Sequence, residues 1–227
     1  MAGKFPIAVD SETGRLTGVV MHEPGSEIAN MTPENAERAL YSDILNLAVA
    51  ADEYAQLKGV LEKRTRIFGV KDLLADILLN PQVRSELVAR ICAAEDMPAI
   101  ADMLADCEPR ELSRLLIEGV PLVKDNLSRF LSRDRYSLPP LHNFFFSRDA
   151  AAVVGDRVLV SRMANQVRGR EACIMEAIFD YHPDLGATTV NPALLGGSGP
   201  TAPLEGGDVL VAAPDILLMG LGARTSR

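Results

Sequence analysis

Two groups of acidic residues stand directly before strand-like segments and could bind a cation. In the first group, three consecutive aromatic residues adjoin Arg148 and Asp149. An apolar pocket wall that presents a carboxylate would attract a cation, and the two carboxylate oxygens match the hydrogen-bonding edge of a planar guanidinium group. The alternative is a core strand that ends in a surface ion pair. The spacing alone leaves both interpretations open.

The second group places Glu205 and Asp208 on either side of a Gly-Gly pair. Because glycine has no Cβ, such a pair lets the backbone approach another group closely or adopt positive φ. The two acids would then form a pocket rim, although a tight turn with solvated acids fits equally well. Arg168 and Arg224 stand at the ends of expected elements, where each would hold a substrate carboxylate or remain solvated.

The remaining reactive side chains indicate no further chemistry. Cys92, Cys107 and Cys173 lie in apolar, helix-periodic contexts that are typical of inert core thiols. The three histidines are isolated and lack metal-ligand spacing, so we expect no metal site. Because the sequence contains no phosphate-cradling loop of the P-loop or dinucleotide type, we expect no nucleotide cofactor either.

Composition excludes several classes of protein. The chain has 227 residues, with 23 basic and 31 acidic side chains and a formal charge of −8. An acidic chain without a basic patch argues against nucleic-acid binding. No apolar run approaches the roughly 18 residues that a membrane-spanning helix needs, and the N-terminal residues contain no apolar signal core. We therefore expect a soluble, cytoplasmic protein.

The elements that would position these side chains follow from periodicity. Strands are expected at Leu16–His22 and Arg66–Val70, with one helix between them that starts at Thr32 and extends through Ala55. Residues 71–135 show helical patterns without strand signals. Three of these helices are expected to begin at an X-Pro step, since proline is favoured at the first helical position: Asn80-Pro81, Met97-Pro98 and Glu108-Pro109.

The last part of the chain returns to strands. Hairpins are expected within Ala151–Met163 and Val209–Leu221, and a helix is expected over Arg168–Tyr181. Asp149 precedes the first hairpin and Asp208 precedes the second. This recurrence predicts a repeated strand–strand–helix–strand unit.

Taken together, the motifs resemble those of the arginine deiminase family in order and approximate spacing, over almost the whole chain. Phe146–Asp149 is similar to the family's Phe-Thr-Arg-Asp motif, and Leu204–Val209 contains its Glu-Gly-Gly-Asp motif. Other segments also resemble family motifs, namely the amino-terminal signature, the Arg-rich helix start and the Gly-Glu-Arg-Thr-Ser motif: Ser11–Leu16, Val19–Gly25, Met31–Pro33, Arg168–Glu171 and Gly222–Ser226.

The resemblance implies a fold. It is an α/β five-bladed propeller of strand–strand–helix–strand units, which would explain the repeat, with an inserted small helical bundle. Residues 1–70 would form the first unit, 71–138 the helical insertion, and 139–227 the second unit with the start of the third. The family's catalytic His and nucleophilic Cys lie beyond the Arg-Thr-Ser motif, where this sequence stops. We therefore expect an incomplete propeller that is inactive alone.

The resemblance also implies a reaction and its residues. The reaction is hydrolysis of L-arginine to L-citrulline and ammonia through a covalent Cys intermediate, without a cofactor. Asp149 matches the carboxylate that grips the guanidinium group, and Glu205 matches the acid beside the catalytic His. The remaining matches hold the amino-acid end of the substrate, line the pocket or support it: Asn143, Arg168, Arg224, Phe146, Asp208, Glu12 and Arg148.

Two departures from the family pattern leave alternatives open. Ala223 replaces the Glu before Arg224, and Ser161–Val167 differs from the usual sequence of the second unit. An arginine dihydrolase, an amidinotransferase and a non-catalytic arginine-binding remnant therefore remain as alternatives. The partner expected in each case is a guanidino compound, and a homo-oligomer is left open. Strand edges left uncovered by an incomplete propeller would favour association.

Overall fold

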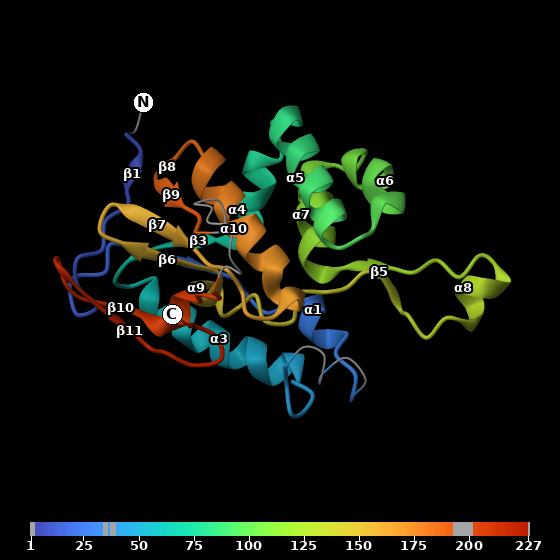
Figure 1. The fold of residues 1–227 in the computed structure, drawn as a ribbon, viewed down its shortest axis with the longest axis horizontal. Helices are drawn as coiled ribbons and strands as arrows, with labels where there is room; N and C mark the ends of the chain where they lie inside the picture. Colours follow the sequence, from blue (N-terminus) through green and yellow to red (C-terminus); the bar gives the residue numbers. More distant parts are fainter. Residues whose placement is uncertain (1–2, 34–35, 37–39, 193–201, 227) are drawn as a thin grey trace. The chain divides into compact units, whose positions relative to one another are not determined.

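The computed structural model describes residues 3–33, 36, 40–192 and 202–226, which form a mixed α/β structure (Figure 1). The chain divides into two compact units. Unit 1 consists of Met1–Val19 and Phe146–Arg227, and unit 2 consists of Val20–Phe145. The expected division at residues 70 and 138 stays a prediction, because compact units and propeller units are different ways of dividing a chain.

Unit 1 contains the expected strand–strand–helix–strand arrangement. Strands β6 (Ala151–Val154) and β7 (Arg157–Val160) form an antiparallel hairpin, with Gly155 at φ +56° in the turn. After helix α10 (Gly169–Tyr181), strand β9 (Thr188–Val190) pairs in parallel with β7. Parallel neighbours need a long crossover connection, and α10 supplies it. The first hairpin and the helix are confirmed.

The second expected hairpin is also present in unit 1. Strands β10 (Val209–Ala213) and β11 (Ile216–Met219) pair antiparallel. The short 3₁₀ helix η3 (Gly206–Asp208) leads into β10, just as the short helix α9 (Ser147–Ala150) leads into β6. Each hairpin therefore follows a helical turn that carries an acidic residue.

Helix α10 and the strands beside it form the core of unit 1. The helix is preceded by the 3₁₀ helix η2 (Gln166–Arg168), and it is followed by β8 (Leu185–Gly186), which pairs in parallel with β1 (Phe5–Pro6). Apolar residues of α10 and of the strands are buried: Val158, Val160, Ile174, Met175, Ile178, Phe179, Leu185, Val209 and Val211. Burial of this apolar face, rather than helix propensity, holds α10 on the sheet.

Unit 2 begins with short elements. Strand β2 (Gly18–Met21), whose second half belongs to this unit, pairs with β3 (Arg66–Gly69), which confirms both expected strands. Helix α1 (Ser26–Ala29) lies between them in the sequence. A small apolar cluster of Ile28, Met31 and Ala36 gathers next to it.

The prediction of one helix from Thr32 to Ala55 is wrong. Residues 34, 35 and 37–39 lie outside the described residues, and Leu40 has a φ of +69°, which no right-handed helix accommodates. Helix α3 (Leu47–Leu61) starts anew at Asn46, whose side chain accepts hydrogen bonds from the N–H groups of the second and third helical residues. The apolar spacing that runs across this break marks no buried face either, because Leu40 and Ile44 are exposed and α3 has no buried residue.

A group of helices makes up the middle of unit 2. Helices α4 (Val70–Ile77), α5 (Pro81–Ala94) and α7 (Pro109–Glu118) are joined by the 3₁₀ helix η1 (Pro98–Ile100) and helix α6 (Ala101–Ala105). The starts at Pro81 and Pro109 are confirmed, whereas Pro98 begins a 3₁₀ turn. Helices α4 and α7 pack together through buried leucine and isoleucine side chains. No helix among the described residues has the length and apolar content to cross a membrane.

A hairpin-like arm follows α7. Strands β4 (Val120–Pro121) and β5 (Tyr136–Leu138) pair antiparallel, and helix α8 (Leu127–Leu131) forms the tip between them. Figure 1 shows the arm projecting away from the helices of unit 2. The expectation that residues 71–135 contain no strand is therefore wrong for β4, a two-residue pairing too short to leave a periodic signal.

Candidate functional site

Asp149 and Asp208 occupy corresponding positions in unit 1. Asp149 lies in α9, where its N–H donates to the carbonyl oxygen of Phe146. Asp208 ends η3, where its N–H donates to the carbonyl oxygen of Glu205. Each acid stands immediately before a hairpin. We call α9 and η3 the acidic turns, because they repeat the same local structure.

The Gly206-Gly207 pair lets these two turns touch. A Cβ on Gly206 would overlap the carbonyl oxygen of Arg148, and a Cβ on Gly207 would overlap the Asp149 carboxylate. Both contacts are closer than a side chain permits, so close approach explains why both positions are glycine. The backbone of Gly206 and Gly207 therefore packs directly against Asp149 and the residue before it.

Arg168 holds two carboxylates together. Its Nη1 atom donates to Oδ2 of Asp149 at 2.7 Å, while its Nε and Nη2 atoms donate to Oε2 of Glu171 at 3.1 and 2.8 Å. The side chains of Arg168 and Glu171 are 6% and 1% exposed, and that of Asp149 is 15% exposed. The planar guanidinium group uses separate edges for the two acids, which a lysine could not do.

Burial changes the acid–base properties of this cluster. Loss of solvation raises the pKa of Glu171 to about 7, although the positive charge of Arg168 opposes the shift. Burial by itself would lower the pKa of Arg168, but the charges of Glu171 and Asp149 outweigh it and raise that pKa above its usual value. Arg168 therefore stays positively charged throughout the physiological range.

Arg224 is the second arginine of the site and is 56% exposed. Its Nη1 atom lies 3.7 Å from Oε2 of Glu205 and 3.9 Å from Oδ2 of Asp149, and its Nη2 atom lies 4.0 Å from Oδ1 of Asp208. These distances are those of loose ion pairs rather than hydrogen bonds. Arg224 can therefore move without breaking a buried contact.

Glu205 is buried and partly satisfied. Its Oε1 atom accepts a hydrogen bond from the N–H of Ala164 at 3.1 Å, and its own N–H donates to Oγ1 of Thr225 at 3.1 Å. Thr225, which is fully buried, donates in turn to Oδ2 of Asp208 at 2.7 Å. Within the described residues, the buried Oε2 atom of Glu205 accepts no hydrogen bond. A buried carboxylate oxygen without a donor is costly, so this atom favours a cationic ligand.

Arg148 and Glu12 tie the N-terminal segment to the second hairpin. Two guanidinium nitrogens of Arg148 donate to the Glu12 carboxylate at 2.6 and 3.2 Å, and Nη2 also donates to the carbonyl oxygen of Val209 at 2.7 Å. Glu12 further accepts from the N–H of Val211 at 3.0 Å. Hydrogen bonds from Arg148 hold the pKa of Glu12 below its usual value. The pair braces the backbone behind the acidic turns.

The charges of the site do not balance. Four carboxylates, those of Asp149, Glu171, Glu205 and Asp208, form ion pairs with two guanidinium groups, and the charge of Arg170 also acts on Glu171, so the cluster carries an excess of one formal negative charge. The low local dielectric strengthens the field of this excess. The arrangement is therefore suited to a positively charged ligand with several N–H donors.

A model of the arginine deiminase family matches residues 37–227 of this chain. The chain belongs to the arginine deiminase family.

Curated arginine deiminases match nearly the whole of this chain. The enzyme of Rhodococcus erythropolis is 34% identical over 244 aligned residues, which cover 99% of this chain and 58% of the relative. The enzyme of Streptococcus equi subsp. zooepidemicus is 30% identical with the same coverages. That of Bacillus cereus is 31% identical and covers 98% of this chain. The chain spans less than three-fifths of the length of these relatives.

The residues that the arginine deiminase motifs single out fall into both units. The structure brings Glu12, Arg148, Asp149, Arg168 and the acids of the second motif into unit 1, with Arg224 among them. Phe146 directly precedes α9 and is 47% exposed. Asn143 is buried and belongs to unit 2, so the site of unit 1 is built from the other residues.

Sequence reasoning missed two residues of the network. Glu171 was seen only as part of the Arg-rich helix start, although its spacing of three from Arg168 is that of a helical ion pair. Thr225 belongs to the Arg-Thr-Ser motif, but nothing in the sequence indicates that its hydroxyl links Glu205 to Asp208.

The cysteines lie on helices or beside them. Cys92 is buried in α5, while Cys107 and Cys173 are partly exposed. Burial and the neighbouring charges of Glu111 and Asp106 raise the pKa of Cys107, which keeps it a thiol at neutral pH. Among the described residues, no group of three or more His, Cys, Asp or Glu side chains is arranged to hold a metal ion.

Proposed function

We propose that this chain supplies the guanidinium-binding part of an arginine deiminase-type hydrolase, which converts L-arginine to L-citrulline and ammonia. The observation that carries the proposal is the buried Oε2 atom of Glu205, which accepts no hydrogen bond among the described residues and faces an acidic cluster. Two arginines of the chain itself already lie against the carboxylates of this cluster. That arrangement supports guanidinium binding, because the same edge-on geometry serves a bound arginine.

The proposed chemistry assigns a role to each charge. Asp149 grips the guanidinium group of the substrate, and Glu205 stands beside the general base, a histidine. A cysteine thiolate attacks the guanidinium carbon, ammonia leaves, and water then releases citrulline. A guanidinium group is a poor electrophile, so carboxylates that stabilise positive charge in the tetrahedral states lower the barrier. Arg224, which is exposed, is proposed to hold the amino-acid end, whereas Arg168, whose guanidinium group is bound by Asp149 and Glu171, is proposed to orient Asp149.

The fold proposed for the complete enzyme is a five-bladed α/β propeller. The β6–β7–α10–β9 arrangement supports it, because this is the strand–strand–helix–strand order of one blade, and the β10–β11 hairpin starts the same order again. Residues 1–70 would belong to the first blade, 71–138 to a helical insertion, and 139–227 to the second blade and the start of the third.

We expect the 227-residue chain to bind arginine without converting it. None of its three cysteines stands in the sequence context of the family's nucleophile, and Cys92 is buried. Binding of L-arginine by the purified chain, measured by isothermal titration calorimetry, tests the first half of this statement. Asp149→Asn is expected to weaken arginine binding at least about tenfold, because it removes the negative charge that binds the guanidinium group.

The control for this titration is Asp156→Asn, which removes an acid from the exposed turn after β6. It should leave the affinity unchanged. L-citrulline, which keeps the amino-acid end but lacks the charged guanidinium group, should bind much more weakly than L-arginine. Equal affinity for the two ligands, or equal effects of the two variants, would contradict the proposed site.

The reaction itself is tested in a chimera, in which these 227 residues replace the matching segment of the Rhodococcus erythropolis arginine deiminase. The chimera should form one citrulline and one ammonia per arginine, and Asp149→Asn should lower kcat by about 100-fold or more. Ornithine with two ammonia would indicate a dihydrolase, and transfer of the amidine to an added amine would indicate an amidinotransferase. Either product would exclude the deiminase proposal.

A further inference from the structure

Arg224 lies against three of the carboxylates that form the proposed guanidinium site. Its Nη1 atom lies nearest to Glu205 and Asp149, and its Nη2 atom lies nearest to Asp208, at distances of 3.7 to 4.0 Å. The shortest of these contacts reaches Oε2 of Glu205, the buried oxygen that accepts no hydrogen bond from a described residue. In the ligand-free chain, the guanidinium group of Arg224 therefore stands where a bound guanidino compound would place its own.

The backbone at Arg224 is anchored, whereas its side chain is held loosely. The next residue, Thr225, is fully buried, and its hydroxyl donates to Oδ2 of Asp208 at 2.7 Å. The N–H of Gly222 donates to the carbonyl oxygen of Thr225 at 2.8 Å and closes a turn around Arg224. The Arg224 side chain is 56% exposed, and its ion pairs are longer than hydrogen bonds. Rotation of side-chain torsions is therefore enough to move the guanidinium group out of the cluster.

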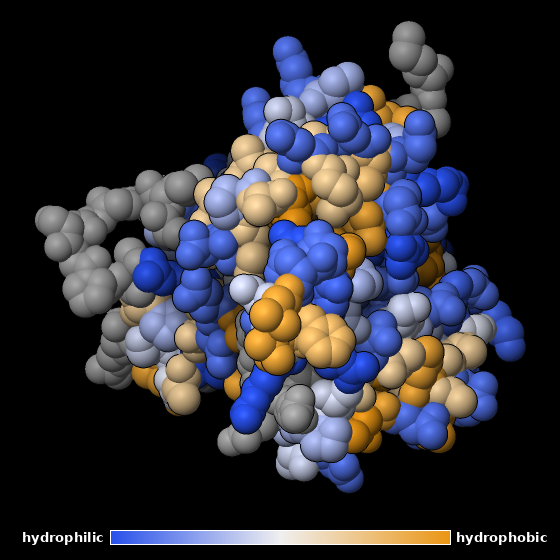
Figure 2. Space-filling view, turned by 90° about the vertical axis from the view of Figure 1, so that its right-hand side faces the viewer, coloured by the Kyte–Doolittle hydropathy of each residue, from blue (hydrophilic) through white to orange (hydrophobic). Residues whose placement is uncertain are grey.

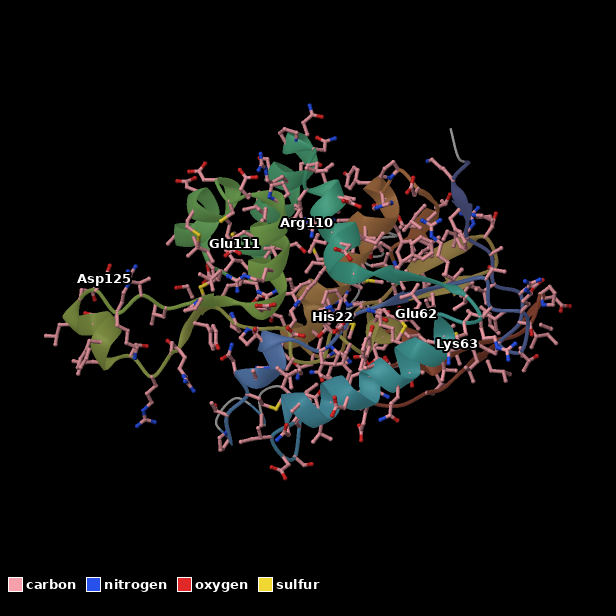
Figure 3. All side chains as sticks on the ribbon, turned by 180° about the vertical axis from the view of Figure 1, so that it is seen from behind. His22, Glu62, Lys63, Arg110, Glu111 and Asp125 are labelled. Atoms are coloured by element: carbon pink, nitrogen blue, oxygen red, sulfur yellow. The ribbon has the colours of Figure 1, made fainter. Side chains whose placement is uncertain are left out.

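Other exposed charges of the chain have more ordinary surroundings. Figure 2, which looks onto the tip of the arm, shows hydrophilic side chains that project into solvent. Arg110 of α7, labelled in Figure 3, is 88% exposed, and Asp72, which lies 3.9 Å away, is 77% exposed. By contrast, Glu205 and Asp149 are only 3% and 15% exposed. Water screens a buried carboxylate less than an exposed one, which favours the inward position of Arg224.

L-Arginine offers a replacement for both sides of this contact. Its guanidinium group has the same charge and the same N–H edges as that of Arg224, so it can take over the ion pairs with Asp149 and Glu205. Its α-carboxylate then gives the displaced Arg224 a new partner. A guanidino compound without a carboxylate supplies only the first of these contacts, so it displaces Arg224 without compensation.

We propose that Arg224 occupies the guanidinium site of the ligand-free chain, and that L-arginine binds by exchanging places with its side chain. The inference rests on the proposed function, because it concerns the same carboxylates. It makes Arg224 a specificity-determining residue, which disfavours guanidinium cations that lack a carboxylate. Displacement of Arg224 leaves one more uncompensated negative charge in the cluster, and the incoming guanidinium group neutralises it.

The exchange affects two classes of ligand in opposite ways when Arg224 is removed. A ligand that needs a vacant site binds with its intrinsic dissociation constant divided by the vacant fraction. Loss of Arg224 makes the vacant fraction complete, so a cation such as methylguanidinium should bind more tightly. L-Arginine gains the same vacancy but loses a charge-assisted contact with its carboxylate, which contributes more than a loose, exposed ion pair. Its binding should therefore weaken.

Calorimetric titration of methylguanidinium and L-arginine into the 227-residue chain and into Arg224→Ala tests the exchange. The variant should bind methylguanidinium about three- to fivefold more tightly and L-arginine about tenfold less tightly. Arg110→Ala is the matched control, because it removes an exposed arginine that pairs with Asp72 instead. It should leave both dissociation constants unchanged. Tighter methylguanidinium binding in both variants would assign the effect to net charge and overturn the exchange.

Nuclear magnetic resonance of the arginine side chains observes the displacement in the unaltered chain. The Nε–H signal of Arg224, assigned from its loss in Arg224→Ala, should shift as methylguanidinium saturates the site. The signal of Arg168 should shift less, because Asp149 and Glu171 hold that side chain. An unmoved Arg224 signal at saturation would overturn the exchange.

The same titrations separate this inference from the proposed function. If methylguanidinium bound Arg224→Ala no more tightly than the wild type, the exchange would be wrong while the guanidinium site would stand. If neither ligand bound the wild type or the variant, the proposed function would fail and the exchange with it. Circular dichroism of Arg224→Ala should match that of the wild type, since the substituted side chain is exposed.

Discussion

The Nη1 atom of Arg168 lies 2.7 Å from Oδ2 of Asp149, so the carboxylate proposed to grip a substrate guanidinium group already carries one from the chain itself. Glu171 holds the same arginine from the other side, and both side chains of that pair are nearly inaccessible to solvent. The three residues form a fixed acid–arginine–acid row, in which Asp149 is the member nearest to solvent. The orientation of Asp149 therefore depends on Glu171, which does not touch it.

Glu171→Gln should change how stability depends on pH. Burial raises the pKa of Glu171 to about 7 in the folded chain, against 4.5 as its ordinary value. Between these pH values the folded chain binds more protons than the unfolded chain, so the free energy of unfolding falls as pH rises from 4.5 to 7. The free energy of unfolding should fall by a total of the order of 3 kcal/mol over this pH range. Glu171→Gln cannot titrate at this position, so its free energy of unfolding should lack this fall.

Urea unfolding from pH 4 to 8 measures this effect as the difference between wild type and variant. Glu176→Gln serves as the control, because Glu176 is buried in the same helix and instead accepts from Asn191. Its pH dependence should follow that of the wild type. Parallel curves for the wild type and Glu171→Gln would refute the prediction.

Arg168→Lys should destabilise the chain by about 3 kcal/mol, since one ammonium group cannot serve two buried carboxylates on opposite edges. Arg157→Lys is the comparison, because Arg157 is exposed in β7 and its nearest acid lies 3.8 Å away. That variant should change the free energy of unfolding by less than about 0.5 kcal/mol. Guanidinium chloride would compete for the site, so urea is the denaturant of choice. Similar losses in both variants would contradict a structural role for the Arg168 fork.

Gly206→Ala should separate the two acidic turns. Its Cβ would overlap the carbonyl oxygen of Arg148, which is backbone and cannot rotate away. We expect a loss of about 2 kcal/mol or more and weaker arginine binding, as the backbone beside Asp149 shifts. Gly169→Ala, at the start of α10, meets no atom within 4 Å and should be neutral or slightly stabilising. Thermal melting of the two variants decides the matter, and equal melting temperatures would count against the close packing.

Glu12→Gln should remove a stabilising contribution that the wild type has at neutral pH and loses at low pH. Hydrogen bonds from Arg148 lower the pKa of Glu12. Its stabilisation is thus present above pH 4.5, the ordinary pKa, and is lost as pH falls through the lower folded value. Since the pair is partly exposed, we expect less than about 1 kcal/mol. Acid unfolding curves should be shallower for Glu12→Gln and unchanged for Asp125→Asn. If both variants gave shallower curves, the effect would come from the loss of any one negative charge and not from the Glu12–Arg148 pair.

Much of the local structure was predictable because it rests on short-range rules. The hairpin turn at Gly155 and the helix starts at Pro81 and Pro109 follow from backbone constraints that each residue imposes on its neighbours. The break before α3 was not predictable from apolar spacing, because Asn46 caps a new helix without disturbing the pattern. The two-residue strand β4 was missed for a related reason, since it is too short for alternation.

By itself, the sequence determined the family, the order of the motifs and the identity of the acids and arginines that carry charge. Their partners were decided by the tertiary structure. Asp149 and Arg168 are 19 residues apart, and Glu205 and Thr225 are 20 apart, so their hydrogen bonds exist only once α10 and the second hairpin have packed. Burial then set the pKa of Glu171 and left one oxygen of Glu205 without a hydrogen bond among the described residues. Desolvation depends on what surrounds a side chain in space, and residue types in order do not specify that.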